Sequence, residues 1–533
     1  MNSLSALLPL LLLACASPSA PPQAAGPAPA AVDSVPFASA EHVVGRPVDS
    51  AAVAAYLQHW NGDADDATAF MEFYRRRAFS GAWVDPSGHL TASAETFLSM
   101  AAESDSLLRG MSVERDTLVE RFVQQGATGG PVAFADPQGT ELDLTAAFFR
   151  YADRNYRGGG AQRTRQLDWF IPVHKKDMSE LLEALCSDSA DITAHEPVHP
   201  QYNRLKQQLK RYQAIEARGG WKPITAEAKG VHKGYRGGVI PEVRARLAAT
   251  GDITYDDRSD AFDTELDKGI KRFQQRYGMD TTGLIDDKLI REMNRPVRDR
   301  VHQIMLNMER LRWLDGNAPP VYLLVNIPEY KLHVFENGTH AWDMVVVVGK
   351  EATRTTIFRG DLSTVVLAPY WYVPQSIVDQ SVKPGMRKDP NYLNRMHMEV
   401  VSQKPFAVRQ KPGEFNSLGL AKFLFPNSYS IYMHDTPSKN LFDRSERAFS
   451  HGCVRLKEPA KLAGYLLRDQ PQWTPEAIDK AMHGGTEKAI RVTKPIPVVI
   501  LYLTAWVDEQ GLINFRDDVY GRDAKLAKEL FVD

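Results

Sequence analysis

Arg447-Ala-Phe-Ser-His-Gly-Cys-Val-Arg-Leu456 and, upstream of it, Tyr432-Met-His-Asp-Thr-Pro-Ser438 bring a cysteine, two histidines and an arginine into one short stretch of the chain. A thiol is a useful nucleophile only as a thiolate. It therefore needs an imidazole that accepts its proton, and cationic or amide groups that stabilise negative charge. All of these groups are present, so the stretch predicts a cysteine nucleophile, Cys453.

An extended strand through this stretch would put His451 and Cys453 on one face, with Cα atoms about 6.6 Å apart, because residues i and i+2 of a strand point the same way. On spacing alone His451 is the candidate base. Gly452 leaves room for a substrate, the amides near Cys453 could form an oxyanion hole, and Arg455 lies on the same face if the strand continues. The plainer alternatives are a small buried cysteine and hydrogen-bonded structural histidines.

The surrounding residues 319–533 are expected to form one β-rich domain. Val321 to Ile327 is a short apolar run, Asn337-Gly338 is a strong tight-turn signal, and apolar residues alternate from Trp342 to Val348. Helical patterns interrupt this region mainly at 460–467 and 475–482. The chemistry is therefore expected in a sheet domain at the C-terminal end of the sequence.

Residues 43–220 and 297–318 show helical spacing of apolar residues and predict a helical scaffold and a linking helix. Cys186 lies in one of these apolar stretches and is expected in the core. Between the two regions, residues 221–296 predict three short helices, and Ile270-Lys-Arg-Phe-Gln-Gln-Arg-Tyr-Gly278 with Gly283 resembles the pattern of small helical peptidoglycan-binding domains. A plain helical hairpin is the alternative for this insert.

The N-terminal residues predict export. Leu4 to Ala14 is an apolar run too short to span a bilayer and suited to a secretory signal. Leu12-Leu13-Ala14-Cys15 resembles a bacterial lipobox, which would make residues 1–15 a signal peptide and Cys15 the lipidation site; simple cleavage after Ala16 is the alternative. Residues 16–42 are rich in Ala and Pro and predict a tether. The expected location is the periplasm, with membrane contact only through a candidate lipid anchor.

Composition excludes some classes of function. The 533 residues carry 64 Lys and Arg against 66 Asp and Glu, a net charge of −2, so no overall positive field would hold nucleic acid, and no nucleic-acid partner is expected. The three cysteines are too few for the dense disulfide framework of a small secreted scaffold.

The motifs around the cysteine resemble the signature of the bacterial L,D-transpeptidases with a YkuD-type catalytic domain. These motifs are Ser450-His-Gly-Cys-Val-Arg455 and the upstream His434-Asp-Thr-Pro437. Further segments, including Trp371-Tyr-Val-Pro-Gln-Ser-Ile377 and Tyr502-Leu-Thr-Ala-Trp506, resemble the large YcbB-like subfamily. The resemblance implies a multidomain α+β fold: a helical scaffold, a small three-helix peptidoglycan-binding-like insert and a β-rich YkuD-type catalytic domain. It also implies a capping subdomain at about 376–423.

The resemblance changes one role. It implies that His434 is the general base and that His451 is a supporting donor for the catalytic Cys453. The residues expected on the oxyanion and substrate side are Ser450, Gly452, Arg455, Tyr432, Trp371 and Asp435. For Tyr432 and Trp371 the alternative is an ordinary place in the core of the domain.

The expected function is peptidoglycan L,D-transpeptidation, in which a cysteine thioester forms 3→3 cross-links between stem peptides and carbapenem β-lactams act as inhibitors. An L,D-carboxypeptidase and a non-catalytic peptidoglycan-binding scaffold are the alternatives. No cofactor and no metal are expected. A zinc site made from His434, His451 and Cys453 is the chemically permitted alternative, since imidazoles and a thiolate bind zinc.

Overall fold

The computed structural model describes residues 45–111, 119–121, 134–187, 192–226, 230–316 and 318–531. The predicted signal peptide at 1–15, with the lipidation site Cys15, and the predicted tether at 16–42 lie outside the described residues. Within the described ranges, no helix combines the length and the apolar character that a membrane span needs.

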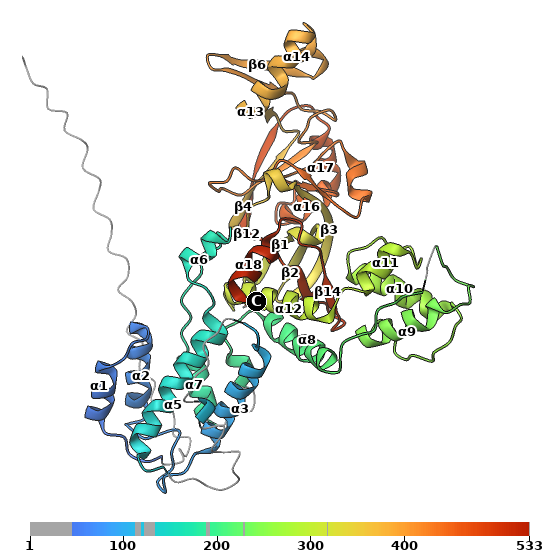
Figure 1. Cartoon of the computed structure of the whole chain (residues 1–533). Helices are drawn as coiled ribbons and strands as arrows, with labels where there is room; N and C mark the ends of the chain where they lie inside the picture. The colour runs from blue at the N-terminus through green and yellow to red at the C-terminus, as the bar shows by residue number, and fades with distance from the viewer. Residues whose placement is uncertain are drawn as a thin grey trace, which may run out of the picture. The chain divides into compact units, whose positions relative to one another are not determined.

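The N-terminal part of the described chain is helical (Figure 1). Its core is aromatic: Phe70 stacks on Phe149 with ring centroids 6.1 Å apart, and Trp60 meets both rings edge-on. Cys186 packs against this core, as expected. The helices are α1 (Ser50–Gln58), α2 (Ala64–Arg76), α3 (Ala92–Leu107), α5 (Pro137–Ala152), the π-helix η1 (Asp153–Arg157), α6 (Ala161–Gln166), α7 (Ser179–Cys186), the 3-10 helix η2 (Ile192–His195) and α8 (Pro200–Ala217).

The next unit contains three short helices, α9 (Val239–Thr250), α10 (Thr264–Arg276) and α11 (Asp287–Met293). Asp263 and Asp286 cap the starts of α10 and α11 with their carboxylates, which is why these helices begin where they do. Arg276 forms a buried ion pair with Asp252 and donates to the Ile513 carbonyl oxygen at 2.5 Å, which ties this unit to the C-terminal segment. The linking helix α12 (Val297–Arg312) follows.

The C-terminal domain is built on a nine-stranded mixed sheet in the order β10-β3-β11-β9-β8-β4-β12-β1-β2. Because β2 also pairs with β3, the sheet closes on itself. Residues from both ends of the domain's sequence therefore meet in one sheet. The strands are β1 (Val321–Asn326), β2 (Lys331–Glu336), β3 (Thr339–Gly349), β4 (Arg359–Leu367), β8 (Ala421–Leu424), β9 (Met433–His434), β10 (Ala448–Ser450), β11 (Val454–Leu456) and β12 (Lys488–Leu501).

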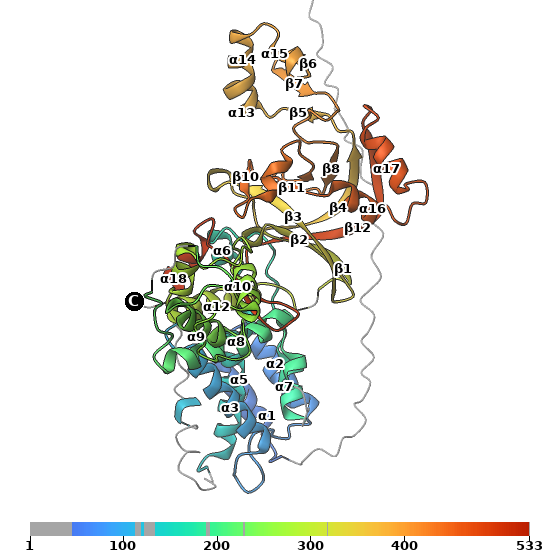
Figure 2. The ribbon, with the colours of Figure 1, turned by 90° about the vertical axis from the view of Figure 1, so that its right-hand side faces the viewer.

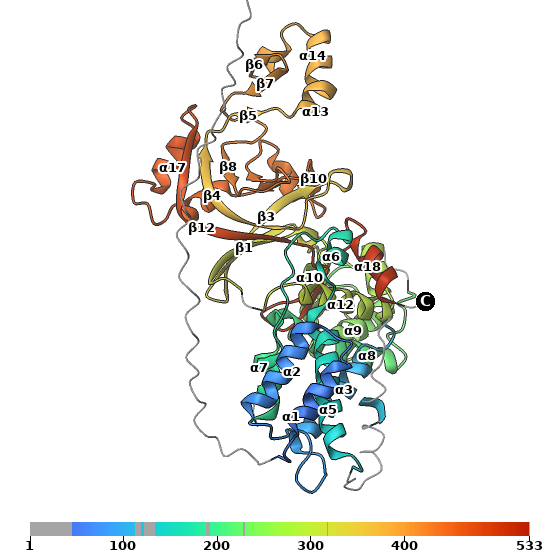
Figure 3. The ribbon, with the colours of Figure 1, turned by 90° about the vertical axis from the view of Figure 1, so that its left-hand side faces the viewer.

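A small second layer has its own core, formed by Val373, Val378, Val382, Met398 and Val408. Its sheet has the order β5-β7-β6, and Figures 2 and 3 show these strands together with α13 and α14. This layer runs from Trp371 to Gln410, whereas the end of the predicted capping segment, 421–423, belongs to β8 of the main sheet. Its elements are β5 (Trp371–Tyr372), α13 (Gln375–Ile377), η5 (Val378–Val382), α14 (Lys383–Lys388), α15 (Tyr392–Arg395), β6 (Met398–Gln403) and β7 (Phe406–Gln410).

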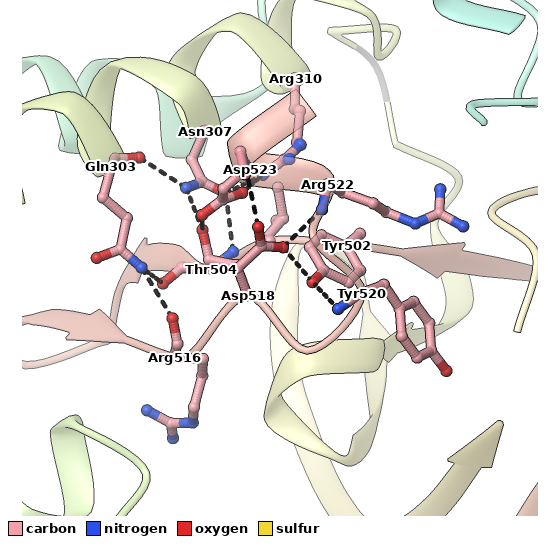
Figure 4. A network of polar contacts seen from close by, with 12 residues as sticks. Gln303, Asn307, Arg310, Tyr502, Thr504, Arg516, Asp518, Tyr520, Arg522 and Asp523 are labelled. Carbon is pink, nitrogen blue, oxygen red and sulfur yellow. Dashed lines mark hydrogen bonds and ion pairs between the residues drawn. The ribbon is translucent and has the colours of Figure 1, made fainter. Parts of the chain in front are cut away.

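The last part of the chain packs on α12 through a buried polar network (Figure 4). Gln303 donates to the carbonyl oxygens of Thr504 and Arg516 at 3.1 and 2.8 Å. The Asn307 side chain donates to the Thr504 hydroxyl and accepts from the Thr504 N–H. Arg310 forms an ion pair with Asp523 at 2.5 Å. The remaining elements are α16 (Pro459–Leu466), α17 (Pro475–Met482), β13 (Ala505–Val507), β14 (Ile513–Phe515) and α18 (Arg522–Leu530). The predicted multidomain α+β class, helical first and β-rich later, is confirmed.

Candidate active site

Two neighbouring parallel strands carry the predicted catalytic residues. β9 and β11 pair in the register Met433 with Val454 and His434 with Arg455. Met433 and Val454 are fully buried in the core. Since side chains alternate along a strand, the residues before and after them face the opposite side of the sheet. His434 and Arg455 therefore share a face, and Tyr432 and Cys453 are the residues directly before the two paired strands.

The expected extended geometry of His451 and Cys453 is wrong. β10 ends at Ser450 and β11 begins at Val454, so residues 451–453 form a bend between two strands. Gly452 has a φ of +115°, which a residue with a side chain rarely adopts. The glycine turns the chain here, and the two-residue spacing that favoured His451 as base therefore has no structural basis.

The Ser450 hydroxyl holds this bend together. It donates to the Cys453 carbonyl oxygen at 2.5 Å and accepts from the Gly452 N–H at 3.1 Å. The Gly452 amide is therefore occupied, while the Cys453 N–H makes no hydrogen bond within the described ranges. Of the amides expected to form an oxyanion hole, that of Cys453 is available and that of Gly452 is not.

A neighbouring loop fixes the bend from outside. The Thr353 hydroxyl donates to the Ser450 carbonyl oxygen and the Thr355 hydroxyl donates to the Gly452 carbonyl oxygen, both at 2.9 Å. Thr355 is fully buried, and its N–H donates to the Tyr520 hydroxyl at 3.3 Å. That hydroxyl in turn donates to the Gly349 carbonyl oxygen at 2.5 Å. The C-terminal segment thus reaches the cysteine bend through two hydrogen-bonded side chains.

The Cys453 thiol is partly buried and is neutral at rest. Burial raises the pKa of this thiol, and hydrogen bonds from Tyr432 together with the Arg455 charge lower it in part. Burial beside the thiol also raises the pKa of the Tyr432 hydroxyl. Tyr432 is consequently a neutral hydrogen-bond partner of the sulfur, which places it at the site as the sequence predicted.

His434 is buried and uncharged. Burial, and next the Arg455 charge, lower the pKa of its imidazole from 6.5 to about 3. Its Nδ1 lies in a short hydrogen bond with the Asp435 carbonyl oxygen, which fixes the ring. The structure thus holds a neutral imidazole in one orientation, between the backbone of Asp435 and that of Leu418.

The other predicted residues have different surroundings. His451 is exposed in the bend. Arg455 is half-buried, and its Nε has no hydrogen-bond partner. Asp435 is buried, accepts from the Leu420 N–H at 2.9 Å and pairs with Lys439, so its carboxylate is engaged in structure. Trp371 packs against the core of the small second layer.

The alternative zinc site is not assembled. Among the residues that the structure describes, the side chains of His434, His451 and Cys453 do not gather their ligand atoms in one place. The sequence interpretation missed Thr355 and Tyr520. Their positions in the sequence give no sign of a contact with Cys453, and only the closed sheet and the C-terminal packing bring them to the cysteine.

Comparisons with known proteins identify three similar domains in the chain. Residues 320–498 match the family model of the L,D-transpeptidase catalytic domain, YkuD. Residues 68–209 match a scaffold domain, and residues 236–293 match a domain described as "Putative peptidoglycan binding domain". These matches confirm the resemblance to the L,D-transpeptidases, and the predicted domain boundaries stay predictions. The YcbB-like subfamily stays a prediction.

A Haemophilus influenzae protein named "Putative L,D-transpeptidase" is 31% identical over 242 residues, a match that covers 42% of this chain and about half, 48%, of that protein. Among solved structures, an L,D-transpeptidase from Stackebrandtia nassauensis is 14% identical with a TM-score of 0.22, over 52% of this chain and 97% of that one. One from Mycobacterium smegmatis is 14% identical with a TM-score of 0.20, over 34% and 58% of the two chains.

Proposed function

We propose, from the premise that residues 320–498 form an L,D-transpeptidase catalytic domain, that this chain forms 3→3 cross-links in peptidoglycan through a thioester on Cys453. The observation that carries the proposal is the shared sheet face. A neutral imidazole on β9 and a guanidinium on β11 face the same side, and the partly buried thiol directly precedes β11. The match of residues 236–293 to a peptidoglycan-binding domain supports the polymer as substrate.

The first half-reaction forms the thioester. Both Cys453 and His434 are neutral at rest, so the thiol proton passes to His434 as the sulfur attacks the carbonyl carbon between the L-centre and the terminal D-residue of a donor stem. The Cys453 N–H stabilises the oxyanion, and Arg455 adds positive charge. The carbon–nitrogen bond then breaks, and the D-alanine amine leaves with the proton from His434.

The second half-reaction transfers the acyl group. The amine at the D-centre of a neighbouring diaminopimelate attacks the thioester carbonyl and gives a proton to His434. The carbon–sulfur bond breaks and the thiol recovers that proton, so the enzyme returns to its resting state. In an L,D-carboxypeptidase, water replaces the amine and the released product is a tripeptide stem.

The deciding experiment incubates purified protein with a disaccharide tetrapeptide and measures product masses. Dimers that have lost one D-alanine support transpeptidation, whereas tripeptide alone with an acceptor present supports the carboxypeptidase. Cys453→Ala should abolish both products while binding to sacculi remains. A non-catalytic scaffold would give no product with the native chain.

The roles of the two histidines are separable by kinetics. His434→Ala should abolish acylation of Cys453, because His434 is the proposed acceptor of the thiol proton, while His451→Ala should only slow it. Acylation is measured as the mass gain of the intact chain after incubation with a carbapenem, whose strained lactam carbonyl is a suitable target for a thiol. Normal acylation of His434→Ala would overturn the role assigned to His434.

We further propose export to the periplasm with Cys15 as the lipidated residue. The apolar run before Leu12-Leu13-Ala14-Cys15 supports this proposal. Detergent partitioning of the mature native chain and of Cys15→Ser distinguishes the lipid anchor from simple cleavage. Only the native chain should enter the detergent phase.

A further inference from the structure

We propose a second functional site in the catalytic domain: a zinc-type divalent metal site formed by His333, His340 and Asp343 on the hairpin of β2 and β3. One ligand atom from each of the three side chains lies within 4.8 Å of the others. None of these residues belongs to the proposed catalytic machinery around Cys453. The inference therefore does not depend on the proposed function.

The hairpin register brings the three side chains to one face. His333 on β2 is the direct cross-strand partner of Asp343 on β3, and such partners share a face. His340 is three residues from Asp343, an odd spacing that would put it on the opposite face of a regular strand. The pairing shifts between Val334 and Phe335, whose partners are Trp342 and His340, so the strand has one extra residue there. This β-bulge returns His340 to the face of Asp343.

The distances fit a metal. His333 Nδ1 and His340 Nε2 are 3.3 Å apart. Two nitrogens bound to one tetrahedral zinc at 2.0–2.1 Å are about 3.3 Å apart, so the imidazoles already stand at the spacing of ligands. Asp343 binds Lys331 through Oδ2 at 2.7 Å, which leaves Oδ1 for a metal. All three side chains are half-buried, so an ion from solvent can enter and keep a water as its fourth ligand.

A buried carboxylate orients the first histidine. His333 Nε2 lies 2.9 Å from Glu329 Oε2, and the same oxygen accepts from Asn326 Nδ2 at 3.3 Å. Glu329 therefore takes the N–H of His333 and leaves the Nδ1 lone pair directed at His340. A carboxylate behind a histidine is the usual support of a metal ligand. The competing interpretation is a plain hydrogen bond between the two imidazoles, and it predicts no metal affinity.

The test titrates Zn²⁺ alone into the full chain carrying Cys453→Ala, which removes the only thiol near His434 and His451. Calorimetry should give one bound ion per chain, and at 100 times the dissociation constant the melting temperature should rise by about 5 °C. Glu329→Gln should weaken binding about tenfold, because the support of the ligand is reduced. Asp343→Asn should also weaken it, and His340→Ala should abolish it.

The exposed pair of His483 and Asp479 provides the matched control, and His483→Ala should bind Zn²⁺ like the parent chain. Melting curves without metal show whether each variant is folded. Asp343→Asn is a near-isosteric change, so it can still test the proposal if His340→Ala does not fold. No stoichiometric binding at 100 µM Zn²⁺, or unchanged binding in both His340→Ala and Asp343→Asn, overturns the proposal. Neither result bears on Cys453 chemistry.

Discussion

Tyr520→Phe tests whether the C-terminal segment positions the nucleophile. The substitution removes one hydroxyl, which donates to the Gly349 carbonyl oxygen at 2.5 Å and accepts from the Thr355 N–H at 3.3 Å. A buried N–H left without its acceptor costs about 1–3 kcal/mol. Taking about 2 kcal/mol, and about 2–4 °C per kcal/mol for a domain of this size, we expect the melting temperature to fall by about 4–8 °C.

The effect on the thiol follows from the next contact. Thr355 holds the Gly452 carbonyl oxygen at 2.9 Å, so a loosened Thr355 lets the bend at Cys453 move. We expect carbapenem acylation and iodoacetamide alkylation of Cys453 to slow about tenfold, which corresponds to about 1.4 kcal/mol. The rates are read at a temperature where the variant is fully folded, and the Cys453 peptide is quantified by mass spectrometry, so that Cys186 does not contribute.

Tyr502→Phe is the matched control. It removes a hydroxyl that donates to Asp518 at 2.6 Å and accepts from the Tyr520 N–H at 2.9 Å, in the same segment but without a contact to the cysteine loop. It should lower the melting temperature by a similar amount and slow the Cys453 rates less than Tyr520→Phe does, because the hydrogen bond between Tyr520 and Thr355 is kept. Equal rates for Tyr520→Phe and the native chain would refute the positioning role.

Three further outcomes follow from the charges of the structure. Because burial raises the pKa of the Cys453 thiol, its alkylation rate should rise with pH to beyond pH 9; a plateau between pH 6 and 8 would indicate a thiolate–imidazolium pair instead. The His434 pKa is about 3 in the fold and 6.5 as its ordinary value, so the unfolded chain binds this proton first and stability falls as pH drops from 6.5 toward 3. Between pH 7 and about pH 4.5, the free energy of unfolding of His434→Gln, measured with urea, should therefore fall by about 3 kcal/mol less than that of the native chain. Equal losses would contradict a buried, neutral His434. Arg276→Met leaves Asp252 as an unpaired buried charge and should lower the free energy of unfolding by about 3–5 kcal/mol. Adding Asp252→Leu should restore most of this loss, as measured by chemical denaturation.

The local spacing of apolar residues in the sequence was sufficient to predict that the chain is helical first and β-rich later. The spacing of Phe70, Phe73 and Tyr74 indicates a helix, and all three are buried in α2. The alternation from Trp342 to Val348 indicates a strand, and β3 spans it. Periodicity works here because it is set by the backbone geometry of each element and needs no information from distant residues.

The same kind of reasoning fails at the cysteine bend. An interval of two residues predicts a shared face only while the chain stays extended, and Gly452 at φ +115° ends the strand. Sequence spacing therefore favoured His451, which is exposed. His434 lies nineteen residues before Cys453, on β9, which pairs in parallel with β11.

Residue types and motifs predicted the chemistry of this protein, since a cysteine, two histidines and an arginine in one stretch limit which reactions are possible there. Contacts between distant segments determine which amide near Cys453 is free, how Thr355 and Tyr520 support the bend, and how a bulge aligns His333 with His340 and Asp343. The physical reason is that residue type and period are local properties of the chain. Strand register and sheet closure depend instead on contacts between segments far apart in sequence, and a shift of one residue would turn every side chain to the other face.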